Sequence, residues 1–273
     1  MSTLVCVHAH PDDESILTAG TMGLAARDGH RVVLVVATRG ELGEPVPGVL
    51  TDGETLGERR EAETHRAAEV LGVERVEFLG YRDSGMMGDP TNDDPMCFWQ
   101  ADIEEAASRL AALLTEVDAD VLTIYDDHGG YGHPDHIQVY RVGMRAAELA
   151  AVDAVYLATA NRDQIVRSRD LSAGVAALPD GVDPDDLPTP PPELDLDTFG
   201  TPETAITHAV DVRDVIELKR AAMATHASQI AADSFFLALP SAAFAFAFGT
   251  EWYVAVGAAR ADGQSFVDSL FPG

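Results

Sequence analysis

The feature that most constrains the fold is a regular alternation of apolar, β-branched segments with amphipathic ones. The segment RVVLVVAT at residues 31–38 is almost continuously apolar, which is typical of a strand buried on both faces of a parallel sheet. Strands are predicted at residues 3–9, 31–38, 75–81, 119–126, 153–159, 205–212 and 251–257. Helices are predicted at residues 14–30, 56–73, 98–118, 136–151 and 212–230. This order predicts an α/β fold, a Rossmann-like and mostly parallel sheet with helices on both faces.

The chain is long enough for one large α/β domain. It has 273 residues, of which 46% are hydrophobic, so it can build a sizeable core. We expect a single domain over residues 1–273, with a core at 3–158, a variable Pro- and Asp-rich segment at 160–205 and a C-terminal strand–helix–strand unit at 206–273. Within it, the Pro- and Asp-rich residues 179–203 predict a solvated loop, with a lid beside the active site as the alternative.

Charge and cysteine content limit the partners and the compartment. The formal net charge is −28, and Lys219 is the only lysine, so nucleic acid and anionic membranes are unfavourable partners. A solvated acidic surface and a host with an acidic proteome explain this charge equally well. The sequence shows no signal-peptide pattern, no bilayer-spanning apolar run and no disulfide framework, which predicts a cytoplasmic protein. It carries no indication of the oligomeric state.

Two clusters of titratable residues follow predicted strands. VHAHPDDES at residues 7–15 follows the first strand, and YDDHGGYGHPDH at residues 125–136 overlaps the end of the fourth. Both contain His-Pro-Asp, and both precede a predicted helix. Because ligands of such sheets bind beyond the carboxyl ends of the strands, we expect the two clusters to meet at one edge.

Together the clusters predict a catalytic metal site. His10, Asp13 and His136 supply two imidazoles and one carboxylate, which suits zinc with an open position for water; ferrous iron is the alternative. Several carboxylates at one sheet edge would repel each other without a cation. Asp12 is left unligated beside the metal, where it can act as the general base toward water.

The second cluster offers further catalytic candidates. His133 can stabilise an oxyanion and protonate a leaving amine, and Asp135 is predicted to orient its ring. Tyr131, on a mobile glycine-rich turn, is a second oxyanion donor. His8 is expected to point away from His10, because side chains alternate along a strand. A structural, hydrogen-bonded role is predicted for His30, His65, His208 and His226.

These residues resemble the PIG-L (LmbE-like) zinc deacetylase family, whose motifs HPDD and HPDH stand at residues 10–13 and 133–136. The resemblance implies a Rossmann-like fold, one divalent metal, usually zinc, and hydrolysis of an N-acetylglucosamine-type amide. It also implies the same metal ligands and the same base. The segments YRDSGMMG, FWQADIEEA and AAMATHASQI are similar to the branch that acts on N-acetylglucosaminyl-inositol in mycothiol biosynthesis.

A sugar substrate requires fixed carboxylates and arginines to bind its hydroxyl groups. Arg60, Asp83 and Glu41 lie past strand ends and are the candidates, with an ion pair to Glu63 as the alternative role of Arg60. The expected products are acetate and a free amino sugar. The alternatives are a mycothiol S-conjugate amidase, a deacetylase or amidase of a natural-product pathway, and a binding module with a relic metal site. The absence of a Gly-x-Gly-x-x-Gly loop after the first strand counts against a dinucleotide binder.

Overall fold

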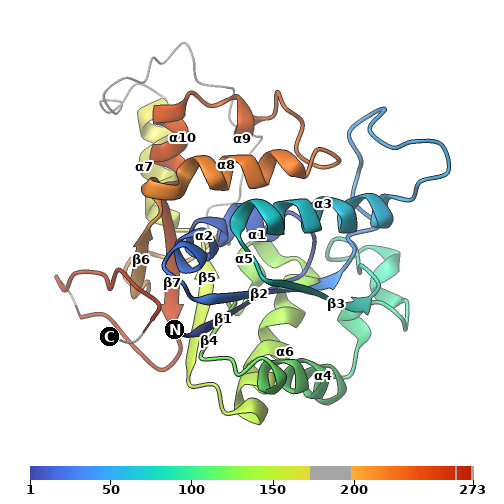
Figure 1. Ribbon diagram of the computed structural model, residues 1–273, viewed down its shortest axis with the longest axis horizontal. Helices are drawn as coiled ribbons and strands as arrows, with labels where there is room; N and C mark the ends of the chain where they lie inside the picture. Colours follow the sequence, from blue (N-terminus) through green and yellow to red (C-terminus); the bar gives the residue numbers. More distant parts are fainter. Residues whose placement is uncertain (173–197, 262, 272–273) are drawn as a thin grey trace.

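The computed structural model describes residues 1–172, 198–261 and 263–271. Its centre is one seven-stranded sheet, which passes through the middle of the molecule (Figure 1). The strands are β1 (Thr3–His8), β2 (Arg31–Thr38), β3 (Arg75–Tyr81), β4 (Val121–Tyr125), β5 (Ala154–Thr159), β6 (His208–Asp211) and β7 (Thr250–Ala255). All seven strands predicted from the apolar runs are therefore present.

The strand order is β3-β2-β1-β4-β5-β7-β6. The first five strands of this order are parallel, and β7 and β6 extend the sheet in antiparallel pairing. This confirms the mostly parallel α/β sheet. The strand β1 lies between β2 and β4, so the chain leaves it in one direction and later returns on its other side. Such a switch point opens a crevice at the carboxyl ends of the two central strands.

Helices cover both faces of the sheet (Figure 1). On one face lie α1 (Asp13–Leu17), α2 (Ala19–Arg27), α3 (Leu56–Leu71) and α8 (Ile216–Thr225), and on the other lie α4 (Ile103–Glu116) and α6 (Pro134–Ala150). The remaining α-helices are α5 (Gly129–Gly132), α7 (Arg162–Ser172), α9 (Phe235–Ala238) and α10 (Ser241–Phe248). Short 3-10 helices span Pro90–Asp93, Phe98–Gln100 and Arg213–Val215.

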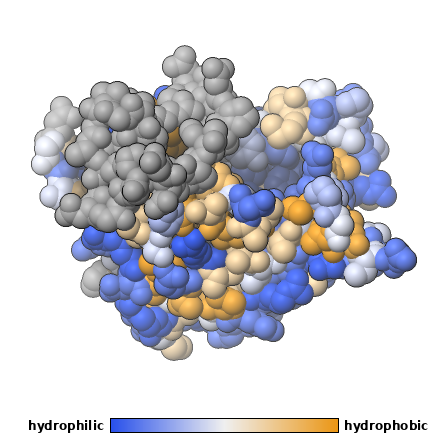
Figure 2. Space-filling model, turned by 90° about the horizontal axis from the view of Figure 1, so that it is seen from above, coloured by the Kyte–Doolittle hydropathy of each residue, from blue (hydrophilic) through white to orange (hydrophobic). Residues whose placement is uncertain are grey.

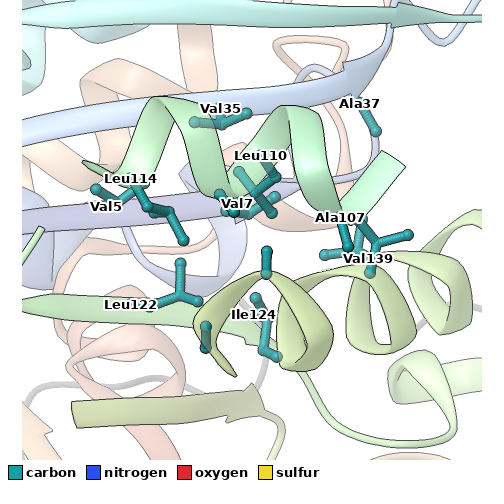
Figure 3. Packing of buried hydrophobic residues seen from close by; sticks show 14 of the residues in the cluster. Val5, Val7, Val35, Ala37, Ala107, Leu110, Leu114, Leu122, Ile124 and Val139 are labelled. Carbon is teal, nitrogen blue, oxygen red and sulfur yellow. The ribbon is translucent and has the colours of Figure 1, made fainter. Parts of the chain in front are cut away.

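Each face of the sheet is sealed by apolar side chains. Under α4 and α6, Leu110 and Leu114 pack against Val5 and Val7 of β1 (Figure 3). All four side chains are almost completely buried. This packing fixes the two central strands and the start of α6 relative to one another, and the functional site is built on their ends.

The helix boundaries follow local capping signals. Thr55 and Glu58 form a capping box at the start of α3, and Gly72 ends that helix in the left-handed conformation with φ 73°. The end at Gly72 was predicted. Two predicted helices are shorter than expected: Asp102 caps α4 by accepting the amide of Glu105, and the predicted helix at 14–30 is divided at Thr18.

The predicted helix at 212–230 begins as a 3-10 turn and ends at Thr225. Beyond it, His226 and Ser228 turn inward to bond carboxylates of α1 and α3, so tertiary hydrogen bonds replace those of a continued helix. Most of the segment predicted at 179–203 to be a loop or lid lies outside the described residues.

The surface of the described residues combines hydrophilic and apolar side chains. Seen from above, the molecule is largely hydrophilic, with apolar residues interspersed near the middle of this face (Figure 2). Among the described helices, none combines the length and the apolar character needed to cross a bilayer.

Candidate metal centre and active site

The two His-Pro-Asp loops meet at the switch point of the sheet. The first loop leaves β1 and enters α1, and the second follows β4 and α5 and enters α6. Since β1 and β4 are adjacent parallel strands, both loops lie at the same carboxyl edge. This brings the side chains of His10, Asp13 and His136 together. The Asp13 Oδ2 atom lies 3.4 Å from both His10 Nδ1 and His136 Nε2.

The hydrogen bonding of His136 leaves one ring nitrogen free for a metal. Its Nδ1 lies 3.2 Å from the carbonyl oxygen of Gly129. A carbonyl can only accept, so Nδ1 carries the proton and Nε2 keeps its lone pair. That Nε2 is buried and has no hydrogen-bond partner in the described part of the chain. A buried ring nitrogen without a hydrogen-bond partner, facing the oxygen of a second possible ligand, is the arrangement expected where a metal ion binds between the two groups.

His10 is oriented in the same way. Its Nε2 lies 3.2 Å from Asp135 Oδ2, so this nitrogen donates, and Nδ1 is the nitrogen that faces Asp13 and could bind a metal in place of its proton. Burial opposes a charge on this ring, but Asp13, Asp135 and Asp83 together hold the pKa of His10 well above its usual value. The surroundings therefore favour positive charge at this point, and the three predicted ligands fit a divalent cation.

His133 lies close enough to be considered as a fourth ligand. Ring nitrogens of His10, His133 and His136 lie within 4.8 Å of one another. The amide of Asp135 donates to His133 Nδ1 at 3.1 Å, which places the proton of the neutral ring on Nε2. Burial and the neighbouring imidazoles lower the pKa of His133 to about 4. His133 is therefore set up as a neutral donor rather than as a ligand.

The carboxylate of Asp135 contacts residues other than His133. Its carboxylate accepts hydrogen bonds from the amide and hydroxyl of Ser84 and from His10 Nε2. Only its backbone amide bonds His133, because His133 is the N-cap of α6 and turns its ring toward the first amides of that helix. The predicted contact of Asp135 with the His133 ring is therefore made by the backbone amide, whereas the carboxylate contacts His10.

Asp12 lies beside the ligands but is held by other groups. Its carboxylate Oδ1 is 3.3 Å from the Arg60 guanidinium, and its backbone adopts φ 97°. This positive φ is uncommon for a residue other than glycine. Burial and the nearby Asp13 raise the pKa of Asp12 to about 6, while Arg60 opposes this shift. A carboxylate of this pKa is suited to accept a proton near neutral pH.

A pocket of about 560 Å³ opens above these residues. It is lined by His10, Asp12, Asp13, Leu42, Gly43, Glu44, Arg60, Asp83, Gly85, Met86, Asp89, Pro90, Thr91, Tyr131, His133 and Gln229. Its volume is in the range of pockets that bind small molecules. The pocket thus joins the candidate metal centre and base to a rim rich in carboxylates.

The three predicted sugar-binding residues lie in different surroundings. Asp83 lines the pocket, whereas Glu41 is not among the lining residues and accepts the amide of Asp83 through Oε1 at 3.3 Å. Arg60 also lines the pocket, but its guanidinium donates to the carbonyls of Gly40 and Pro11 and faces Asp12.

The alternative pairing of Arg60 with Glu63 does not occur. Glu63 accepts hydrogen bonds from Ser228 at Oε1 and Oε2. The side chains of Arg60 and Glu63 are both buried and contact different residues, so their i,i+3 spacing along α3 did not identify their partners.

Tyr131 stands at the edge of the pocket and is 45% exposed. Its ring lies edge-on to that of His136, with centroids 5.0 Å apart. Burial raises the pKa of the Tyr131 hydroxyl, which keeps it protonated and able to donate. The turn that carries it has Gly130 at φ 72°, and this residue is tied to Asp126 and Gly200 by backbone hydrogen bonds.

Comparison with known proteins agrees with this geometry. The model of the PIG-L family, described as GlcNAc-PI de-N-acetylase, matches residues 5–147. The chain belongs to the PIG-L family. A relative from Thermomonospora curvata, named 1D-myo-inositol 2-acetamido-2-deoxy-alpha-D-glucopyranoside deacetylase, is 41% identical over 99% of this chain and 96% of its own length.

Solved structures share the fold of this PIG-L chain at low identity. A deacetylase of teicoplanin biosynthesis matches with a TM-score of 0.58 and 17% identity over 94% of this chain and 99% of its own. The 4-carboxy-2-hydroxymuconate hydratase GalB of Pseudomonas putida matches with a TM-score of 0.57 and 18% identity over 97% of this chain and 100% of its own. A hydratase on the same fold shows that function must be argued from the site.

Two residues of the candidate site were not found from the sequence. The hydroxyl of Tyr125 donates to Asp13 Oδ2 at 2.7 Å and accepts the amide of Ala9. Ser84 bonds Asp135, as described above. Tyr125 ends β4 and Ser84 follows Asp83, so their positions past strand ends were the available signal. His8 bonds Tyr125 and Thr18 and takes no part in the group of ligands.

Proposed function

We propose that this protein is a zinc-dependent N-deacetylase that converts N-acetylglucosaminyl-inositol to acetate and the free amino sugar. The observation that carries the proposal is the convergence of His10 Nδ1 and His136 Nε2 on the Asp13 carboxylate, with Asp12 beside them in a carboxylate-rich pocket. The name of the relative from Thermomonospora curvata supports the substrate. Ferrous iron, which nitrogen and oxygen ligands also bind, is the alternative metal.

His10, Asp13 and His136 would hold the ion. When bound, a divalent metal polarises the acetamide carbonyl and lowers the pKa of water to near neutral. Asp12 accepts the proton of the attacking water. Arg60 holds the Asp12 carboxylate in place, and its position fits this task better than the binding of sugar hydroxyl groups, for which it was a candidate.

The other polar groups face the acetamide from the opposite side. His133 presents an N–H to the carbonyl oxygen as negative charge develops. The departing amine nitrogen takes the proton that Asp12 accepted from water, because a neutral imidazole does not give up its N–H proton near neutral pH. Tyr131 provides a second donor from the glycine-rich turn. Neither group needs to be charged before reaction, which agrees with the low pKa of His133 and the raised pKa of Tyr131.

The rim of the pocket suits a polyhydroxylated ligand. Asp83, Glu44 and Asp89 present carboxylates, which accept hydrogen bonds from sugar and inositol hydroxyls. Asp83 is the nearest to the metal ligands, since its Oδ1 lies 3.7 Å from His10 Nε2. We therefore assign hydroxyl recognition first to Asp83, with Glu41 fixing the backbone behind it.

The test is an assay of amine release with zinc-loaded protein. The substrates are N-acetylglucosaminyl-inositol, free N-acetylglucosamine and a mycothiol S-conjugate, and the variant is Asp12→Asn. We expect the inositol glycoside to give the highest kcat/KM, and Asp12→Asn to bind zinc normally but to lose about 10²–10⁴-fold in kcat.

The outcomes separate the parts of the proposal. Preference for the S-conjugate would assign the protein as an amidase of mycothiol conjugates, and equal use of free N-acetylglucosamine would remove the inositol from the substrate. Zinc-loaded Asp12→Asn with normal turnover would place the base elsewhere.

A further inference from the structure

The backbone of Asp12 is held in its unfavourable conformation by a buried carboxylate two residues further on. With φ 97° and ψ −30°, Asp12 lies in a region that residues with a Cβ atom rarely adopt. Its amide donates to Glu14 Oε2 at 3.0 Å. The carbonyl of Asp12 accepts the amides of Ser15 and Ile16 as α1 begins. The carbonyl of Asp12 is thus held by the first turn of α1, and its amide is held by the Glu14 carboxylate.

Glu14 is itself fixed by a residue far along the chain. Its Oε1 lies 2.6 Å from His226 Nε2 and accepts the hydroxyl of Ser15 at 2.7 Å. Glu14 and His226 are both 0% exposed, and neither lines the pocket. Since a carboxylate only accepts, His226 Nε2 donates to Glu14. The segment that carries His226 is secured to α3 by the backbone amide of Ser228, which donates to Glu63 Oε1 at 3.1 Å and is present in any variant at this position except proline.

We infer that Glu14 and His226 are positioning residues for the proposed base: through the Asp12 amide they fix the direction in which the Asp12 carboxylate points. Arg60 holds the same carboxylate from α3 at 3.3 Å. Asp12 is therefore held at two points, at its carboxylate by Arg60 and at its backbone by Glu14. This inference rests on the proposed role of Asp12, because a residue that acts through Asp12 matters only if Asp12 takes part in the reaction.

The first test compares Glu14→Ala with Glu14→Gln in zinc-loaded protein, using N-acetylglucosaminyl-inositol as the substrate. Glu14→Ala removes the acceptor of the Asp12 amide, and a misplaced catalytic group costs up to about 100-fold, so we expect kcat to fall about 10- to 100-fold. KM and bound zinc should stay at the wild-type values, since Glu14 contacts neither the pocket nor a ligand side chain. Glu14→Gln keeps an oxygen for the Asp12 amide and should restore most of kcat.

His226 and a neighbouring residue provide a matched pair. His226→Ala should lower kcat in the same way, and His226→Gln, which keeps a donor toward Glu14, should recover much of it. Ser228→Ala is the control, because it removes a buried hydrogen bond of the same segment to Glu63 and leaves the contact of Glu14 with Asp12 intact. Its kcat should equal that of the wild type. A loss in Ser228→Ala as large as in His226→Ala would overturn the inference in favour of general destabilisation.

A double-variant comparison decides whether Glu14 acts through Asp12. In the Asp12→Asn background, Glu14→Ala should lower the residual single-turnover rate by less than about twofold, because groups that act as a unit are not additive. An equal loss in both backgrounds, or a loss of zinc in Glu14→Ala, would overturn the inference. If Asp12→Asn itself turns over normally, the proposed function fails at its base. If Asp12→Asn is inactive while Glu14→Ala is normal, only this inference fails.

Discussion

Replacement of Asp135 tests whether its side chain acts through His10, which it contacts, or through His133, whose ring it was predicted to orient. In Asp135→Asn, the amide nitrogen can face the Ser84 hydroxyl, which can accept, so the remaining oxygen still takes the proton of His10 Nε2. The His10 ring keeps its orientation, but its hydrogen-bond acceptor at position 135 no longer carries a charge. In Asp135→Ala that acceptor is lost completely. Substitutions behind a metal-binding histidine typically cost about 10- to 100-fold in metal affinity.

We therefore expect the zinc Kd to rise about 10-fold in Asp135→Asn and about 100-fold in Asp135→Ala, which corresponds to about 1.4 and 2.8 kcal/mol. Competition with a chelator measures the Kd, and kcat is then measured at saturating zinc. Ser84→Ala is the control, because it removes one hydrogen bond to Asp135 and leaves the contact with His10 in place. An unchanged zinc Kd with a large loss of kcat at saturating zinc would refute the assignment and return Asp135 to His133.

Two further predictions concern specificity and stability. Asp83→Asn should lower kcat/KM for the inositol glycoside about 10- to 100-fold, since a charged hydrogen bond contributes about 1.5–3 kcal/mol, and the loss for free N-acetylglucosamine should be smaller; parallel kinetics with both substrates measure the difference. Leu110→Ala removes a fully buried side chain between α4 and the sheet and should lower the free energy of unfolding by about 2–5 kcal/mol in urea titrations; a loss below about 1 kcal/mol would mean that the site collapses around the substitution.

The positions of the strands along the chain, their mostly parallel pairing and the meeting of the two clusters could be predicted because they depend on short-range patterns. A run such as Val32–Ala37 must be buried on both faces, and strands of this kind separated by helices pair in parallel. Once the sheet is parallel, residues that follow different strands share one edge. His10 and His136 therefore meet without any knowledge of the intervening chain.

The partners of buried polar side chains could not be read in this way. The spacing of Arg60 and Glu63 offered an ion pair along α3 as the alternative role of Arg60, but an exposed pair of this kind contributes only about 0.2–0.5 kcal/mol. Buried polar groups left without hydrogen bonds cost more, about 1–3 kcal/mol each. Arg60 therefore turns to the carbonyls of Gly40 and Pro11, and Glu63 turns to Ser228. The hydrogen-bond partners of buried polar groups depend on which loops the fold brings close. The spacing of residues along one helix does not give this information.

The same reasoning explains why His226 was predicted to be a structural, hydrogen-bonded residue without a named partner. Its contact, Glu14, lies 212 positions earlier in the chain. Only the passage of α8 over α1 and α3 brings the two together (Figure 1). A histidine with that role can still matter for catalysis when its hydrogen bond supports the backbone of a proposed base. The distinction between a structural and a positioning histidine therefore depends on what its partner holds, and in this fold that partner holds Asp12.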